Sequence, residues 1–251
     1  MKVSIVTAVY NRARTLPDTI ESVLSQTHRD IEYIVIDGLS DDGTANVIEQ
    51  YADRIDHYRR EKDRGIYDAL NKGIRLATGD IVGVLHADDF FAHQEVLSRV
   101  VQAFEEHSRV MGTYGDLIYV DSHDTARLVR TWRSGDYQLD RFRWGWMPPH
   151  PTVYLRRECY ERFGVFRDEF HQAADYELLL RMMFVHRIQV HYIPETLVCM
   201  RVGGKSNATL SNRIRANRED AKAWIVNGIR PPVGLRFLKP FRKLRQFLTS
   251  G

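Results

Sequence analysis

Strand-like and helix-like segments alternate through the first hundred residues of this chain, and that order limits the folds available to it. Short apolar runs rich in β-branched residues predict strands, and the segments between them have the apolar spacing of helices. Because the connections are short, the alternation favours a parallel sheet covered by helices on both faces. The expected strands are 3–9, 31–36, 55–60 and 81–85, and the expected helices are 15–25, 44–50, 66–77 and 94–106.

The pattern changes after residue 107, where extended segments become more frequent. The elements expected there are strands at 111–120, 126–132, 152–155 and 188–200, and helices at 158–163, 174–185 and 206–226. We therefore predict one α/β domain over residues 1–227, with a mixed, mainly parallel sheet and helices on both faces. Its two halves are 1–107 and 108–227, and a separate tail, 228–251, follows.

The composition is ordinary for a globular protein, with 43% hydrophobic and 27% charged residues. Cys159 and Cys199 are the only cysteines, which are too few for a disulfide framework and lack the spacing of metal ligands. No apolar run approaches the roughly 18 to 20 residues that a membrane-spanning helix needs. The chain begins directly with a strand-like segment, so we expect no signal peptide and a reducing, cytoplasmic location.

Two adjacent carboxylates, Asp88 and Asp89, follow the predicted strand 81–85 almost directly. In open α/β sheets, ligands bind at the carboxyl ends of the strands. Neighbouring acids repel each other unless a cation, or hydrogen-bond donors such as sugar hydroxyls, lie between them. The alternative is that they cap the next helix, because Asp is a favoured N-cap residue.

The ends of the first two predicted strands carry Tyr10, Asn11 and Asp37. An aromatic ring can stack on a nucleobase and a carboxylate can accept its N–H, although Asn and Asp also commonly begin turns. The glycine-rich dinucleotide motif and the P-loop are both absent from the sequence, which disfavours a Rossmann dehydrogenase. A bound nucleotide would need another counter-charge, which a divalent cation on the acidic pair would supply.

Four motifs in a fixed order point to a family. They are SIVTAVYNR at 4–12, IVIDGLSDDGT at 34–44, DRGIYDALNKGIRLATGD at 63–80 and HADDFF at 86–91. Their order and spacing closely resemble the inverting glycosyltransferases of family 2, most strongly over residues 3–91 and more loosely to about Asn207. The resemblance implies a Rossmann-like GT-A fold and transfer of a sugar from a nucleotide donor, for which UDP is the family's commonest carrier.

The resemblance also assigns residues to the donor. Ala8, Tyr10 and Asp37 would hold the base, with Asp63 near it. Ala8 stands where some relatives have a hydroxyl residue, so a side-chain hydrogen bond is lost there.

The acidic pair corresponds to the family's Asp-x-Asp signature, here with Ala87 at its first position. By resemblance, Asp89 is the expected ligand of Mn²⁺ or Mg²⁺, and Asp88 faces the ribose and donor sugar. His86 is a departure, since relatives often have Asn there. It could be a further contact or a structural histidine.

Transfer with inversion requires a general base that takes the proton from the acceptor hydroxyl. In the family this base is an acid at the start of a helix in the second half, and the segment 173–181 (AADYELLLR) matches that pattern. Asp175 is therefore the expected base and Glu177 the second candidate. The same position could also serve as the N-cap of an amphipathic helix.

Two later segments resemble parts of the family that approach the diphosphate. The Pro-rich loop at 149–152 would hold His150 near the diphosphate and the acceptor. The segment 201–206 resembles a flexible stretch that closes over the donor, where Arg201 and Lys205 would supply positive charge.

The tail accounts for the net charge of +3, because residues 228–251 contain six bases and no acid. Leu and Phe residues interleave with these bases, and helical spacing would gather much of the apolar set on one face. Such a tail predicts peripheral contact with an anionic membrane, the alternative being packing on its own domain or a second subunit. Nucleic-acid binding is not expected, since no basic face on the domain accompanies the tail.

Together these features predict a metal-dependent glycosyltransferase at the inner face of the cell membrane. Its acceptor would be a saccharide hydroxyl, lipid-linked, in cell-surface polysaccharide biosynthesis. The alternative is a non-catalytic protein on the same fold that binds nucleotide-sugars or glycans.

Overall fold

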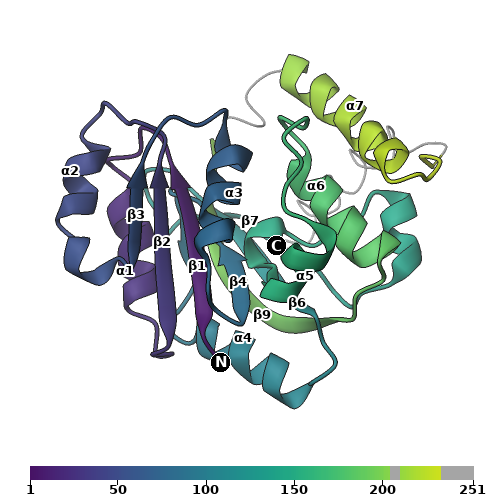
Figure 1. Cartoon of the computed structure of the whole chain (residues 1–251), viewed down its shortest axis with the longest axis horizontal. Coiled ribbons are helices and arrows are strands. Elements are labelled where there is room, and N and C mark those ends of the chain that lie inside the picture. Colours follow the sequence, from purple (N-terminus) through teal and green to yellow (C-terminus); the bar gives the residue numbers. More distant parts are fainter. Residues whose placement is uncertain (204–209, 233–251) are drawn as a thin grey trace.

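Residues 1–203 and 210–232 are described by a computed structural model, in which one nine-stranded sheet forms the middle layer of this part of the chain (Figure 1). Its strands are β1 (Val3–Val9), β2 (Ile31–Asp37), β3 (His57–Arg60), β4 (Ile81–Val84), β5 (Asp89–Phe91), β6 (Gly112–Val120), β7 (Leu128–Trp132), β8 (Tyr154–Arg156) and β9 (Val190–Arg201). Their order across the sheet is β3-β2-β1-β4-β8-β6-β9-β5, and β7 pairs with β6. The predicted α/β class with a mixed sheet is confirmed.

Helices lie on both faces of the sheet. The α-helices are α1 (Leu16–Leu24), α2 (Thr44–Glu49), α3 (Ile66–Leu76), α4 (Val96–Glu106), α5 (Arg157–Phe163), α6 (Ala174–Leu179) and α7 (Leu210–Val226). Side chains alternate between the two faces of a strand. Accordingly, Val6 and Ala8 of β1 join the core that contains α3, whereas Ile5 and Val9 join the core that contains α1 and α4. Because β1 is buried on both faces, its sequence is apolar except for Ser4 and Thr7.

Strand β4 joins the two halves of the sheet. It pairs in parallel with β1 on one side and antiparallel with β8 on the other. Beyond β8, the antiparallel neighbour β6 is followed by β9, which runs parallel to β6. The segment that leaves the end of β4 therefore lies where the first half of the chain meets the second.

Strand β5 was not expected from the sequence. It contains Asp89 and pairs antiparallel with β9, in the register Asp89↔Met200, at the far edge of the sheet. The next helix, α4, begins at Val96 and has Glu95 at its N-cap position. The alternative in which the acidic pair caps that helix is therefore wrong.

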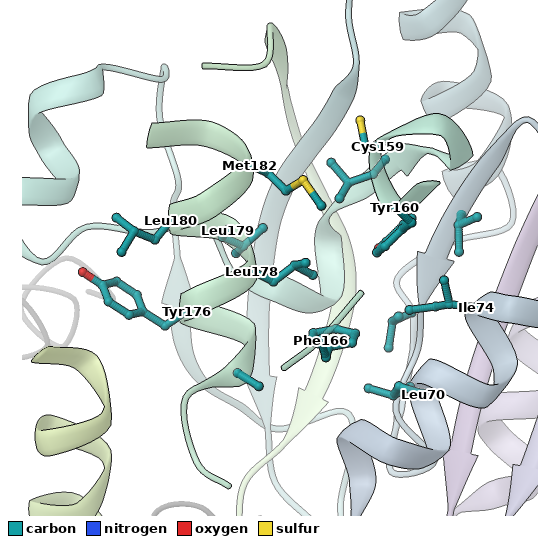
Figure 2. Packing of buried hydrophobic residues seen from close by; sticks show 14 of the residues in the cluster. Leu70, Ile74, Cys159, Tyr160, Phe166, Tyr176, Leu178, Leu179, Leu180 and Met182 are labelled. Carbon is teal, nitrogen blue, oxygen red and sulfur yellow. The ribbon is translucent and has the colours of Figure 1, made fainter. Parts of the chain in front are cut away.

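The predicted helix 174–185 consists of α6 and a π-helical continuation (Leu180–Val185). Figure 2 shows that Leu178 points toward Phe166 and the side chains of α3, whereas Tyr176 points to the opposite side of the helix. There the Tyr176 hydroxyl accepts a hydrogen bond from Nε1 of Trp224 in α7, at 2.9 Å. Helix α6 is thus packed between α3 and α7, and its position is fixed from both sides.

Two predictions concern residues outside the described ranges. The first residues of the predicted helix 206–226 and most of the tail 228–251 belong to this group, and α7 is described from Leu210 onward. Within 1–203 and 210–232, no helix has both the length and the apolar character required to cross a bilayer.

A buried carboxylate joins three segments at the amino end of the sheet. Glu32 of β2 accepts hydrogen bonds from Ser4 Oγ (2.5 Å), Thr78 N (2.7 Å) and Thr78 Oγ1 (2.6 Å), and its Oε1 lies 3.1 Å from Lys2 Nζ. Burial by itself raises the pKa of Glu32, but these hydrogen bonds outweigh it and lower the pKa to about 2. The ionised carboxylate therefore stabilises the fold.

The pKa of Glu32 predicts how this contribution depends on pH. Because the pKa falls from 4.5 to about 2 on folding, the stabilisation is complete above pH 4.5 and is lost as the pH falls toward 2. We expect Glu32→Gln to lower the free energy of unfolding by about 2 kcal/mol at pH 7. In urea titrations this difference should shrink below pH 4.5. A difference that is independent of pH would contradict the assignment, and Glu21→Gln, in an exposed pair with Arg54, is the matched control.

Candidate functional site

Tyr10 and Asp63 meet at the carboxyl ends of β1 and β2. Gly38, which follows β2, lies between them: a Cβ at this position would collide with the Asp63 carboxylate and lie 3.6 Å from the Tyr10 ring. Tyr10 is half exposed, and Asp63 accepts a hydrogen bond from Gly65 N at 2.9 Å. Two residues predicted to contact a nucleobase are thus brought together, although they are far apart in the sequence.

Asp37 and Ala8 are buried beneath this position. The Asp37 carboxylate accepts hydrogen bonds from Ser40 N (2.9 Å) and Ser40 Oγ (2.6 Å), and it forms an ion pair with Arg60 Nε at 3.1 Å. Its side chain has no exposed surface and holds the turn after β2, and the predicted contact of Asp37 with a base stays a prediction. The methyl group of Ala8 belongs to the apolar core.

The adjacent acids have different surroundings. Asp88 is 30% exposed at its side chain, and its Oδ2 lies 3.7 Å from Nε of Arg12. Asp89 is 1% exposed, and neither of its carboxyl oxygens has a hydrogen-bond partner. Burial and the neighbouring charge of Asp88 hold the pKa of Asp89 well above its usual range. Two buried carboxyl oxygens without a partner are the kind of ligand that a hard cation prefers, and the predicted role of Asp89 as a metal ligand stays a prediction.

Arg201 of β9 contacts the segment that carries Asp88 and Asp89. Its guanidinium donates a hydrogen bond to the carbonyl oxygen of Asp88 at 2.8 Å, pairs with the carboxylate of Asp18 and lies 4.9 Å from the centre of the Phe90 ring. It is 7% exposed. Arg201 therefore holds the loop that presents Asp88, and its predicted contact with a diphosphate stays a prediction. Lys205 lies outside the described residues.

Asp175 and two histidines form a continuous chain of polar contacts. His150 Nδ1 lies 3.0 Å from Asp175 Oδ2, and His150 Nε2 lies 2.9 Å from Nε2 of His86. The hydroxyl of Tyr67 donates to Asp175 Oδ1 at 3.3 Å. Burial and the charge of Asp175 raise the pKa of Tyr67 well above 10, so the phenol keeps its proton. Burial and His150 lower the pKa of His86 to about 4.

These four side chains line one cavity, although they come from α3, the segment after β4, the 3₁₀ turn His150–Thr152 and α6. The cavity has about 410 Å³ of empty space, counting the solvent at its mouth, and its other walls are largely apolar. The predicted base, Asp175, and the predicted diphosphate contact, His150, are therefore in direct contact with each other. His86, which the sequence left without a role, completes the chain.

The second candidate for the base has a structural role. Glu177 has no exposed side-chain surface and forms ion pairs with Arg181 Nε at 2.9 Å and Arg167 Nε at 3.1 Å. Its Oε1 also accepts a hydrogen bond from Asn227 Nδ2 at 3.0 Å. A carboxylate that is paired in this way is not free to take a proton from a substrate, and Glu177 is excluded.

The start of α6 is held by a residue of α7. Helix α6 begins at Ala174 and its N-cap residue, Ala173, has no side-chain hydrogen bond, so Asp175 lies in the first turn and is not the cap. Glu219 of α7 fills that role: its Oε2 accepts hydrogen bonds from the backbone N–H groups of His171 (3.1 Å), Gln172 (2.7 Å) and Ala173 (2.9 Å). Helix α7 thus fixes the turn that carries Asp175.

Sequence reasoning missed three residues of this site. Tyr67 lies within the third motif, four residues after the predicted donor contact Asp63, and this position in the sequence could have indicated a role in the site. Glu219 is one acid in a polar helix, and nothing in the sequence indicates that it caps a turn 46 residues earlier. Arg12 lies at the end of the first motif, where its pairing with Asp88 depends on the sheet order.

The described residues contain no group of three His, Cys, Asp or Glu side chains that could hold a metal ion. Asp88 is the acid of the predicted pair that has access to solvent. Asp89 lies buried next to it, and the two acids stay the predicted site of a cation and the donor sugar.

The sequence has recognisable relatives. The family model described as Glycosyl transferase family 2 matches residues 4–163. A PGL/p-HBAD biosynthesis glycosyltransferase of Mycobacterium bovis is 28% identical over 208 residues, which is 81% of this chain and 78% of the relative. An uncharacterized glycosyltransferase of Nostoc sp. is 31% identical over 238 residues, which is 89% of this chain and 71% of the relative.

Solved structures share the fold. TarS of S. aureus, in complex with UDP-GlcNAc, has a TM-score of 0.73 at 17% identity, over 90% of this chain and 67% of that one. The mannosyltransferase PcManGT from Pyrobaculum calidifontis, in complex with GDP-Man and Mn²⁺, has a TM-score of 0.66 at 18% identity, over 99% of this chain and 70% of that one. This chain spans about two thirds of the length of each, and at these identities the likeness is one of fold.

Proposed function

This chain belongs to glycosyl transferase family 2, and on that premise we propose that it transfers a sugar from a nucleotide-sugar to a saccharide hydroxyl with inversion at the anomeric carbon. The family and the GT-A fold expected from the motifs are confirmed. One observation carries the proposal: Asp175 lies in a cavity at the meeting of the two halves, with its carboxylate oriented by Tyr67 and His150. A carboxylate held in this way suits a general base.

The donor is proposed to bind along the carboxyl ends of β1, β2 and β4. Tyr10 would stack on the base and Asp63 would accept one of its N–H groups, since both lie against Gly38. We propose a UDP-sugar, which the complex of TarS with UDP-GlcNAc supports, although the complex of PcManGT contains GDP-Man. Arg201 and Lys205 stay proposed contacts of the diphosphate, and His150 is proposed to lie near the diphosphate and the acceptor.

A divalent cation, Mn²⁺ or Mg²⁺, is proposed to be held by Asp89. Its two carboxyl oxygens have no hydrogen-bond partner, and they fit this role because hard cations prefer oxygen ligands and the donor's phosphate oxygens can complete the shell. The cation would supply positive charge at the departing diphosphate. Asp88, which has access to solvent, is proposed to face the ribose and the donor sugar.

In the proposed reaction, Asp175 takes the proton of the acceptor hydroxyl while that oxygen attacks the anomeric carbon from the face opposite the diphosphate. The new glycosidic bond forms as the bond between the anomeric carbon and the phosphate oxygen breaks, and the nucleoside diphosphate leaves with that electron pair. Asp175 is left protonated. Tyr67 and His150 hold its carboxylate in place, which reduces the entropy cost of proton transfer.

We propose that the acceptor is a lipid-linked saccharide of the cell surface and that the basic tail brings the enzyme to the inner face of the membrane. The six bases and the interleaved Leu and Phe residues of 228–251 support this proposal, with each base near an anionic leaflet contributing about 1 kcal/mol. The relatives named for PGL/p-HBAD biosynthesis support a biosynthetic role.

The base is tested with Asp175→Asn, which keeps the shape of the side chain but cannot accept a proton at neutral pH. We expect nucleoside diphosphate release from UDP-sugars, in the presence of Mn²⁺, to fall by about 100-fold or more. Donor binding, followed as a rise in melting temperature, should be retained. Asp53→Asn, on an exposed turn, is the control. Full turnover of Asp175→Asn would refute the role, and donor binding without any release by the wild type would favour the non-catalytic alternative.

Parallel Asp→Asn substitutions distinguish the roles of the two adjacent acids, Asp88 and Asp89. Asp89→Asn should abolish the part of the donor-induced thermal shift that EDTA removes from the wild type. Asp88→Asn should keep that part. Metal dependence lost in Asp88→Asn but kept in Asp89→Asn would contradict the assignment of the ligand.

A further inference from the structure

His86 lies at the end of the chain of polar contacts that begins at Asp175. Its Nε2 lies 2.9 Å from Nε2 of His150, and the two rings meet edge to face with their centres 5.1 Å apart. Its other nitrogen, Nδ1, is buried and has no hydrogen-bond partner. The single polar contact of the His86 ring is therefore the one to His150.

The contact between His150 and Asp175 decides which of the two rings carries the proton between them. An ionised carboxylate only accepts hydrogen bonds, so His150 must carry a proton on Nδ1, which faces Asp175 Oδ2 at 3.0 Å. If His150 is neutral, its Nε2 is then an acceptor, and the proton between the two rings belongs to Nε2 of His86. Nδ1 of His86 then carries only a lone pair. A buried acceptor without a partner is less unfavourable than a buried N–H without one.

The opposite arrangement is less favourable. A proton on Nε2 of His150 would make that ring an imidazolium and oblige His86 to accept through its Nε2. His86 would then have to carry its own proton on Nδ1, as a buried N–H without an acceptor. The arrangement with two neutral rings avoids this cost.

We propose that His86 is a positioning residue whose Nε2–H donates to Nε2 of His150, so that His150 presents its Nδ1–H to Asp175. Because this contact occupies the lone pair of His150, that histidine cannot take the proton of the acceptor. Proton removal is thereby reserved for Asp175, and both histidines act on its orientation. This inference rests on the proposed function, since it presumes Asp175 as the base.

The test compares three variants that differ in the ability of residue 86 to donate a hydrogen bond. His86→Asn retains an N–H donor, His86→Leu has no polar group, and His86→Asp offers only acceptors at pH 8. Ring ¹⁵N NMR at pH 8 reads His150 directly, with His150→Gln used to assign its signals among the ten histidines. The wild type and His86→Asn should show a neutral His150 with a proton on Nδ1 and a hydrogen-bonded Nε2. His86→Leu should lose the hydrogen-bond shift at Nε2, and His86→Asp should keep His150 doubly protonated.

Turnover gives a second readout. Substitution of a residue that hydrogen-bonds to a functional histidine typically changes activity by about 10- to 100-fold. We therefore expect His86→Leu to lower kcat by about tenfold with little change in the KM of the donor. His86→Asn should recover most of this loss. The matched control is His107→Leu, which breaks the contact of another histidine pair, His107 with His191, away from the cavity.

Two results would overturn the inference. Unchanged His150 ring signals in His86→Leu would show that His86 has only a packing role. A raised donor KM with unchanged kcat would make His86 a donor contact. Because the NMR signals do not depend on turnover, they test the contact even if Asp175→Asn were to refute the proposed function.

Discussion

The site depends on the pairing of β4 with strands from both halves of the chain. Its parallel bonds to β1 and antiparallel bonds to β8 place the segment after β4 beside the turn that leads into β8. His86 belongs to the first of these segments and His150 to the second, and their rings are in contact for this reason. A sheet with β4 at its edge would separate the donor side from Asp175.

Burial gives the two adjacent acids different chemistry. Asp89 is the first residue of β5, and its side chain lies within the protein, where an ionised carboxylate needs a counter-charge. Asp88 precedes the strand, keeps access to solvent and lies near Arg12. Two identical side chains thus have different surroundings, one as the proposed cation ligand and the other on the proposed sugar side. The same principle separates Asp175 from Glu177, whose charge is fully compensated by two arginines.

The sequence predicted the elements that have a clear period and failed where long-range contacts decide. Strands β1, β2 and β4 and helix α3 were expected within a few residues of their ends, because continuous apolar runs and helical spacing are local signals. Strand β5 has three residues and exists through its pairing with β9. The motifs identified Asp175 and His150, but their contact, the partner role of His86 and the cap from Glu219 depend on residues brought together by the fold.

The central claim is that Asp175 directs attack on the anomeric carbon from the face opposite the diphosphate. The most direct test is ¹H NMR of the sugar first released when water replaces the acceptor, recorded before the free sugar equilibrates between its anomers. An α-linked UDP-sugar should give the β anomer first, and Asp175→Asn should suppress its release. Release of the α anomer first would contradict the account.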